Sequence, residues 1–248
     1  GTAASYTITA SPGGATCQVI SPATSCTISS LTNGTSYTFT STASNTAGNS
    51  SSSSTSSAVV PAGLPSEPLG VSGTGLGGTV SLTWNVPDSN GGSPITSYTL
   101  TVVETGQTFT GSGSPITVTG LTNGSSYTFK VSATNAVGTS DSSTASAPIK
   151  IAGVADAPAT VTAVAGDQSA TVSATGNWNT VAGSGGESVT AIVFTTMDGL
   201  HTCTATLPAT SCTMTGLTNG TAYTFSAVAQ NAVGNSPATT SSAVTPAG

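Results

Sequence analysis

A nine-residue segment that occurs three times constrains the fold of this 248-residue chain more than any other feature. The copies are LTNGTSYTF at 31–39, LTNGSSYTF at 121–129 and LTNGTAYTF at 217–225. Their asparagines, Asn33, Asn123 and Asn219, are 90 and then 96 residues apart. Because this spacing matches the length of one small domain, the repeat indicates a chain of similar modules.

The sequence around each copy divides the chain into three units, residues 1–61, 62–151 and 152–248. SYTITAS in the first unit aligns with SYTLTVV in the second, and each unit closes on a small apolar group such as SAVVPAG. Short links rich in Pro, Gly and Ala join the units. Links this short cannot behave as free coils, so we expect neighbouring modules to be oriented semi-rigidly.

Alternating apolar residues predict strands throughout. In SYTFKVSATN, Tyr127, Phe129, Val131 and Ala133 share one face, and polar residues occupy the other. Helical spacing occurs over no useful length, and turn sequences such as PDSNGGSP and ETGQ follow one another every 8–12 residues. The pattern predicts an all-β chain of antiparallel β-sandwiches.

Four cysteines form two local pairs, Cys17 with Cys26 and Cys203 with Cys212, each nine residues apart. Two strands joined by a loop containing SPAT or LPAT would bring each pair to bridging distance. Zinc would need a different spacing, and His201 is the only histidine. The remaining alternative is two pairs of reduced core thiols. We predict two disulfides, each linking adjacent strands of one sheet, and an oxidising compartment.

Unit 2 resembles a fibronectin type III module. It has a Pro-rich start, LPSEPLGV, then a strand with Trp84, then GGSPITSYTL, and ATNAVGTS matches the turn into the last strand. The resemblance covers nearly the whole chain and implies tandem immunoglobulin-like antiparallel β-sandwiches of fibronectin type III type, with Trp84 in the core. An apolar pair near Phe109 and Ile116 replaces the disulfide in unit 2. In unit 3 the alignment sets Gly176 opposite Trp84, with Trp178 two residues on, so we expect its early core to pack differently.

The repeated nonapeptide matches the family's tyrosine corner. Its Asn-Gly pair supplies the left-handed conformations of a tight turn. The leucine is expected beneath the corner, and the tyrosine hydroxyl bonds back to the backbone upstream. The resemblance gives this role to Tyr37, Tyr127 and Tyr223, each of which we expect to be largely buried.

Composition excludes several classes of function. Charged residues make up 4% of the chain, and Lys130 and Lys150 are its only cations, for a net charge of −6. Two cations cannot neutralise a run of phosphates, so we expect no nucleic-acid partner. A polybasic membrane anchor is excluded for the same reason, and no apolar run approaches the roughly 20 residues of a membrane span.

Catalytic chemistry finds little support in the sequence. A catalytic site needs a base, a nucleophile or a metal held in a pocket. His201 is expected on an exposed edge strand, and the carboxylates are scattered over different units. Asp88 and Asn90 in PDSNGG could contribute to a calcium site, but calcium takes six or more oxygens and a turn explains them. We therefore expect no enzymatic activity, no cofactor and no metal.

Glycosylation is possible at four Asn-x-Ser/Thr sequons, Asn33, Asn49, Asn123 and Asn219. Three of them lie in the Asn-Gly turn, where turn geometry already explains the asparagine. The Ser/Thr tract at 49–57 is either a site of O-glycans or an ordinary edge strand kept soluble by its hydroxyls. The residues do not decide between these two interpretations.

The start of the chain gives a further expectation. By the alignment Gly1 matches Ser93, so unit 1 lacks the two strands that LPSEPLGV and GGTVSLTW supply in unit 2. The face carrying Tyr6, Tyr37 and Phe39 would then be open, with an unpaired edge. We expect another polypeptide or, preferably, residues of the same longer protein before Gly1 to cover it.

Repetition without active-site residues, local disulfides and a charge-poor surface predict an extracellular or cell-surface structural segment. It would act as a spacer, an adhesive stalk or a fibre subunit. The partners would be further repeats of a longer protein or copies of itself, and conceivable ligands are cell-surface or polysaccharide molecules. Alternatives are an accessory region of a secreted polysaccharide-degrading enzyme and a virion decoration or tail-fibre module.

Overall fold

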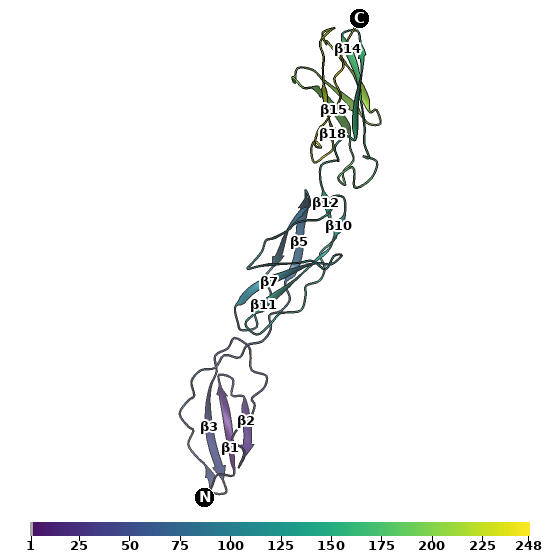
Figure 1. Ribbon diagram of the computed structural model, residues 1–248. Helices are drawn as coiled ribbons and strands as arrows, with labels where there is room; N and C mark the ends of the chain where they lie inside the picture. The colour runs from purple at the N-terminus through teal and green to yellow at the C-terminus, as the bar shows by residue number, and fades with distance from the viewer. Residues whose placement is uncertain (1) are drawn as a thin grey trace.

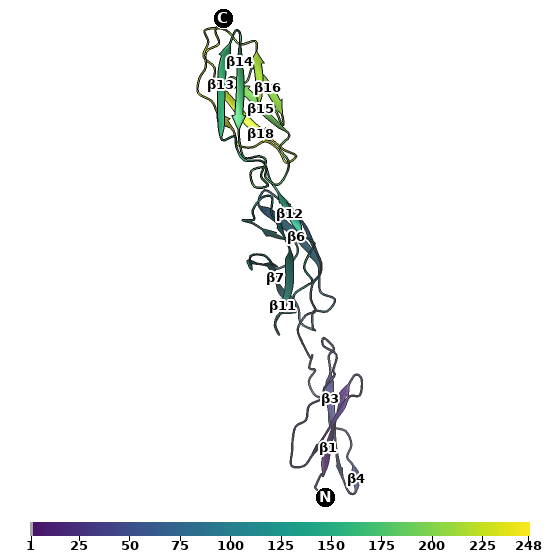
Figure 2. The ribbon, with the colours of Figure 1, turned by 90° about the vertical axis from the view of Figure 1, so that its right-hand side faces the viewer.

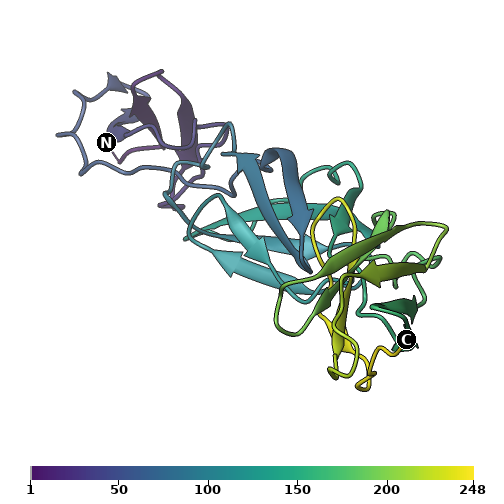
Figure 3. The ribbon, with the colours of Figure 1, turned by 90° about the horizontal axis from the view of Figure 1, so that it is seen from above.

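The three units lie end to end in the computed structural model, which describes residues 2–248, and form an elongated rod (Figures 1 and 2). The two ends of the chain lie at opposite ends of the rod. Seen from above, the ribbons of the three modules are displaced sideways from one another (Figure 3). All regular elements of the described residues are β-strands, and none of those residues belongs to a helix that could span a membrane. The predicted fold class, all-β with tandem antiparallel β-sandwiches, is confirmed.

Module 2, formed by the second unit, is a sandwich of two sheets. One sheet has the order β10-β12-β5-β6-β9 and the other the order β11-β7-β8. Their strands are β5 (Leu69–Leu76), β6 (Thr79–Asn85), β7 (Ile95–Val102), β8 (Thr108–Gly111), β9 (Ile116–Val118), β10 (Ser126–Tyr127), β11 (Phe129–Asn135) and β12 (Ile149–Ala152). Alternation along the strands sets the core: every second residue of β11 is buried.

The core of module 2 forms where the inner faces of these sheets meet. Leu82, Leu100 and Phe129 are fully buried there. Trp84 is also buried, as expected, and its ring packs against that of Tyr98 with centroids 5.2 Å apart.

Module 3, formed by the third unit, repeats this arrangement with sheets β13-β14-β17 and β16-β15-β18-β19. Its strands are β13 (Thr160–Gly166), β14 (Ser169–Thr175), β15 (Ala191–Thr196), β16 (Thr202–Thr206), β17 (Ser211–Thr215), β18 (Phe225–Gln230) and β19 (Thr239–Thr240). Phe194, Phe225 and Met214 are fully buried between the two sheets.

The register of module 3 corrects the position assigned to Gly176. Val80 in β6 pairs with Val118 as Ala170 in β14 pairs with Met214, so Ala174 is the counterpart of Trp84. Trp178 comes from the longer loop after β14 and returns to the core. There its Nε1 donates a hydrogen bond to the Asp156 carbonyl at 2.9 Å. The alignment was wrong by two residues because the large side chain enters from the loop instead of the strand.

Module 1, formed by the first unit, is one sheet with the order β2-β1-β3-β4. Its strands are β1 (Ser5–Ser11), β2 (Thr16–Ile20), β3 (Thr38–Asn45) and β4 (Gly48–Asn49). Residues 2–61 contain no second sheet. Because β9 and β17 bond to β6 and β14, the corresponding segment at 26–30 has no strand to pair with and stays irregular.

One face of this single sheet is therefore open along residues 2–61. An apolar groove there is lined by Ile8, Cys17, Cys26, Ile28, Leu31 and Phe39. Tyr6 is 37% exposed, but Tyr37 is only 7% exposed, so the expectation that the open face exposes Tyr37 was wrong. Gly1, from which the alignment with Ser93 starts, lies outside the described residues.

The Ser/Thr tract of module 1 follows β3 with an unusual spacing. Ser50, Ser53 and Ser56 bond to alternate residues of β3. Each serine N–H donates to a β3 carbonyl, and each Oγ accepts the N–H of that same residue at 3.0 Å. Each step of three residues along the tract therefore corresponds to a step of two residues along β3. The tract is not an ordinary edge strand, since serine hydroxyls take the place of backbone carbonyls.

Candidate functional site

The structure contains both disulfides, with Cα atoms 6.1 Å apart for Cys17–Cys26 and 6.2 Å apart for Cys203–Cys212. Cys203 lies in β16 and Cys212 in β17, which belong to different sheets. The expectation that each bridge links adjacent strands of one sheet was therefore wrong. The short loop between the cysteines carries the chain across the side of the sandwich, and the bridge joins the edges of the two sheets.

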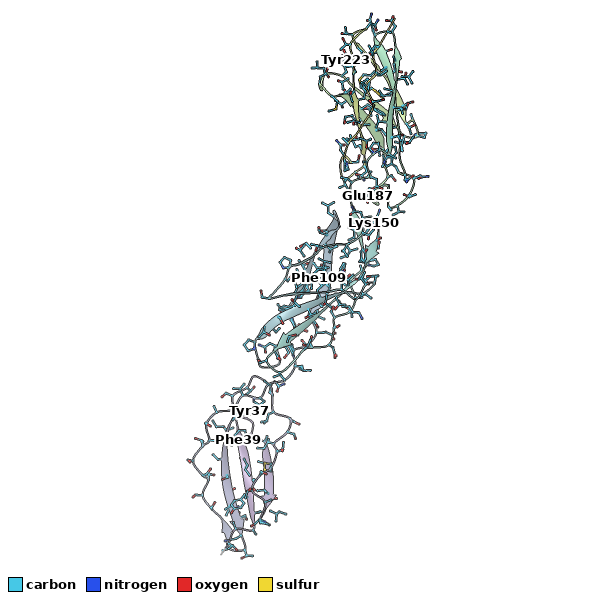
Figure 4. All side chains as sticks on the ribbon, in the orientation of Figure 1. Tyr37, Phe39, Phe109, Lys150, Glu187 and Tyr223 are labelled. Carbon is cyan, nitrogen blue, oxygen red and sulfur yellow. A yellow bond between two sulfur atoms is a disulfide. The ribbon has the colours of Figure 1, made fainter. Side chains whose placement is uncertain are left out.

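Module 2 has Phe109 and Ile116 where module 3 has its disulfide. Phe109 pairs with Leu100 in register, as Cys203 pairs with Phe194, and Ile116 pairs with Leu82, as Cys212 pairs with Val172. Ile116 is buried, and Phe109 packs against the same core (Figure 4). An apolar contact thus closes the edge of module 2 that a covalent bond closes in module 3.

Removing the Cys203–Cys212 bridge should destabilise module 3 alone. In the double variant Cys203→Ala/Cys212→Ala, the free energy of unfolding should fall by about 2–3 kcal/mol, because a bridge across so short a loop removes limited entropy from the unfolded chain. Hydrogen exchange of the full chain, followed by mass spectrometry, measures each module separately. Module 2, which has no cysteine, is the internal control. Unchanged exchange in module 3 would contradict the prediction.

All three tyrosine corners are formed. Each hydroxyl oxygen accepts a hydrogen bond from the backbone N–H five residues upstream, at 3.1 Å for Tyr37, 3.2 Å for Tyr127 and 3.1 Å for Tyr223. These backbone bonds lower the pKa of Tyr37 and of Tyr127, because an accepted N–H favours the phenolate. Tyr37 is buried, but Tyr127 and Tyr223 are only half-buried, so the expected burial holds for one of the three.

Tyr127→Phe should lower the stability of module 2 by about 1 kcal/mol, the usual contribution of one hydrogen bond. The group that loses its partner is the Thr122 N–H, and water can reach this exposed turn. Urea unfolding of the full chain, followed by fluorescence of Trp84 in a Trp178→Phe background, measures the change. Tyr98→Phe is the control, because the Tyr98 hydroxyl has no hydrogen-bond partner within residues 2–248. A larger loss in the control would overturn the assignment.

The junction of modules 1 and 2 is a set of backbone contacts. The Gly34 N–H, in the Asn-Gly turn of module 1, donates to the Pro61 carbonyl at 2.9 Å. The Gly63 N–H, in the link, donates to Gly91 in the Gly-Gly turn of module 2 at 2.8 Å. Asn135, at the end of β11, donates through Nδ2 to the Gly63 carbonyl at 2.8 Å. The turn, the link and the next module are thus bonded in series.

The junction of modules 2 and 3 repeats the same contacts at equivalent residues. Gly124 donates to the Ile151 carbonyl at 2.6 Å, and Gly153 donates to Gly185 at 2.8 Å. Asn231 Nδ2 donates to the Gly153 carbonyl at 2.8 Å. We call each set a joint. Each of these three hydrogen bonds of the second joint has its counterpart in the first.

Asn135 and Asn231 are the site residues that the sequence analysis missed. Both are polar and buried, and each side chain makes four hydrogen bonds. The Nδ2 group donates to the link and to the Gly-Gly turn, while Oδ1 accepts two N–H groups of the loop that follows. The repeated NAVG at the ends of β11 and β18 was the signal that could have found them.

One ion pair supplements the second joint. Lys150 Nζ lies 3.2 Å from Glu187 Oε1, where modules 2 and 3 meet (Figure 4). The two side chains are 49% and 35% exposed, so solvent screens the attraction. The first joint has Val60 and Ser93 at the corresponding positions and keeps the same backbone contacts. The ion pair is therefore an addition to the joint and not its basis.

The remaining sequence-predicted residues lie apart from one another. His201 is half-buried, with its ring edge-on to Tyr223 at 6.3 Å between centroids. The Asn90 Oδ1 caps its own turn by accepting the Gly92 N–H at 2.9 Å, and Asp88 lies nearby on the surface. In the described part of the chain, no group of three His, Cys, Asp or Glu side chains could hold a metal ion.

The four sequon asparagines differ in access. Asn33, Asn49 and Asn219 are exposed, although Asn219 Nδ2 donates to Asp167 at 2.7 Å. Asn123 is part of the second joint: its Oδ1 is buried without a hydrogen-bond partner. A glycan on Asn123 would have to displace the neighbouring link at Gly153, and one on Asn33 would have to displace the link at Gly63, so we expect Asn49 to be the better acceptor.

The protein is a tandem array of β-sandwich modules. Each complete module has two sheets, all three modules have a tyrosine corner, and two equivalent joints connect them. Residues 66–149 match the sequence model of the fibronectin type III domain. The chain contains a fibronectin type III domain there, and the resemblance seen in the sequence is confirmed. Module 3 shares its corner, strand register and joint.

Similarity extends to two further proteins. Chitinase A1 of Niallia circulans is 32% identical over 178 residues, an alignment that covers 69% of this chain and 24% of the chitinase. The chain thus spans about a quarter of the length of this relative. The crystal structure of the FN1–FN3 domains of chicken CNTN1 aligns over 99% of this chain and 89% of that one. Its TM-score is 0.36, at 17% identity.

Proposed function

We propose that the chain is an accessory, non-catalytic fibronectin type III region of a secreted polysaccharide-degrading enzyme. The observation that carries the proposal is the 32% identity with part of Chitinase A1, whose name describes an enzyme that acts on chitin. The two disulfides fit this proposal, because such bridges persist in oxidising, extracellular surroundings. In that setting the modules separate domains that bind or cleave the polymer.

The shape supports a spacer role. The three modules follow one another along a rod, so whatever is joined at one end is held away from the other (Figure 1). Charged groups are 4% of the residues, and such a surface offers little electrostatic attraction to ionic partners.

A second candidate is a stalk or fibre segment of a cell-surface protein. The observation that favours it is the repetition of the joint, because equal contacts between modules suit a long array. The two candidates differ in what else the mature polypeptide contains: a hydrolytic domain in the first and none in the second.

Antibodies against the 248-residue chain can distinguish them. We expect them to capture from the culture medium of the source a polypeptide well above 23.7 kDa that hydrolyses colloidal chitin or another insoluble polysaccharide. Peptide mapping of the captured protein should show a glycoside hydrolase domain. Captured material without hydrolase peptides or activity would reject the enzyme proposal and favour the stalk. The isolated chain, tested for retention on insoluble chitin, should stay in solution if it is only a spacer.

A further inference from the structure

We propose that the two joints are one reusable, rigid coupling that fixes the orientation of each module relative to the next. Its specific elements are the Asn-Gly turn and link of one module, and the Gly-Gly turn and buried asparagine of the module that follows. This inference does not depend on whether the rod serves an enzyme or a stalk.

The first half of the coupling is the Asn-Gly turn with its link. Gly34, Gly124 and Gly220 have φ angles of +81°, +81° and +80°, so the turn is the same in all three modules. Each N–H donates to the first residue of the Pro-Ala-Gly or Ile-Ala-Gly link. In the third copy the Gly220 N–H donates to the Pro246 carbonyl at 2.9 Å. Within residues 2–248 no further module packs against this turn.

The second half is the Gly-Gly turn, which packs backbone on backbone. A Cβ atom on Gly92 would overlap the Gly34 backbone, and one on Gly186 would lie 2.5 Å from Gly124 Cα. The other glycine of each pair, Gly91 or Gly185, faces the carbonyls of the link. Contact this close leaves no room for side chains that could repack in a second orientation.

The buried asparagine then ties the second half to the link. Asn135 bonds the carbonyls of Gly63 and Asn90, and Asn231 bonds those of Gly153 and Ser184. These hydrogen bonds lie within residues 63–135 and 153–231, so they hold the link against the module that follows it. The hydrogen bonds hold the link to the turn on each side of it, and the backbone contact of Gly34 with Gly92 and of Gly124 with Gly186 opposes bending at the joint.

Equality of the two joints is the strongest argument that the coupling is specified. The loop that carries the Gly-Gly turn is longer in module 3, yet the glycines and the asparagine return to the same partners. The surface at the Asn-Gly end thus fits one kind of partner: a fibronectin type III module with Gly-Gly before the strand equivalent to β7 and β15, and Asn-x-x-Gly at the end of the strand equivalent to β11 and β18. Successive modules of that kind advance by a constant step.

Gly124→Ala and Gly220→Ala form a matched pair that tests the coupling in the full chain. Both place alanine in the same left-handed turn, so the local strain is equal. A Cβ on Gly124 would lie 2.7 Å from Val181 Cγ1 and 3.3 Å from Gly186 Cα, whereas one on Gly220 has nothing within 4 Å. Any difference in module orientation between the two variants is therefore due to the contacts that the added methyl group makes at the joint.

Residual dipolar couplings measured by NMR report the relative orientation of modules 2 and 3. In the wild type and in Gly220→Ala, both modules should fit a single alignment tensor. In Gly124→Ala that common tensor should be lost, with each module still well fitted by its own. Wild-type modules that need separate tensors, or a Gly124→Ala variant identical to wild type, would overturn the proposal.

Gly153→Val keeps the test decisive if Gly124→Ala fails to fold. Gly153 does not have a left-handed φ, so the substitution adds no backbone strain to either module. Its side chain would overlap that of Asn123 inside the joint. Loss of the common tensor is again expected, and its retention in this variant would count against a rigid coupling.

Discussion

Trp178→Ala should lower the free energy of unfolding of module 3 by about 3–5 kcal/mol, the range for truncating a buried aromatic side chain. The indole belongs to the main core of module 3, and its Nε1 satisfies the Asp156 carbonyl. Truncation removes both the packing and that hydrogen bond. Module 2 should keep its stability, because Trp84 fills the corresponding volume from its own strand. Hydrogen exchange of the full chain gives both values in one measurement.

Gly176→Ala tests the same packing from the opposite side. A Cβ atom at position 176 would overlap the Trp178 ring, and overpacking of this kind costs roughly 1–3 kcal/mol. In a Trp178→Ala background the ring is absent, so the added methyl group should cost little. The double-mutant cycle therefore predicts a large coupling between these two positions. Additive effects would mean that the indole lies elsewhere.

Replacing Ser140, Ser143 and Ser146 together by alanine should remove most of the stability of module 2, by roughly 3–6 kcal/mol at 1–2 kcal/mol per site. The three Oγ atoms accept the N–H groups of Ala133, Val131 and Phe129 at 3.0, 3.0 and 3.1 Å. Those three residues of β11 are fully buried, so water cannot replace the lost acceptors. The result should be an unfolded or strongly destabilised module 2 between intact neighbours.

Ser142→Ala and Thr144→Ala are the matched controls for this triple variant. Both residues lie in the same tract and are exposed, and both leave the bonds to β11 untouched. Urea unfolding followed by Trp84 fluorescence in a Trp178→Phe background should show a midpoint near that of wild type for the controls. Ser143→Ala alone should give an intermediate loss. Equal effects in the exposed and buried positions would contradict the role given to the serine hydroxyls.

The sequence by itself determined the features that depend on short-range order. Period-two alternation in SYTFKVSATN placed Phe129 and Val131 in the core, because a strand sends alternate side chains to opposite faces. The Asn-Gly pair specified a left-handed turn, and the tyrosine corner followed within a few residues of it. Cysteines nine residues apart paired locally, as a loop that short requires. All of these involve residues close together along the chain.

The tertiary structure decided whatever joins distant segments. Alternation shows which face of a strand is buried but not which sheet the strand enters, so the bridge from Cys203 to Cys212 was assigned to one sheet when it joins two. The Trp178 ring reaches the core from a loop, where no periodicity marks it. Asn135 bonds a link 72 residues before it, and Asn231 one 78 residues before it. Such contacts exist only in the folded chain, because the carbonyls they use are ordinary backbone until the sandwich brings distant segments together.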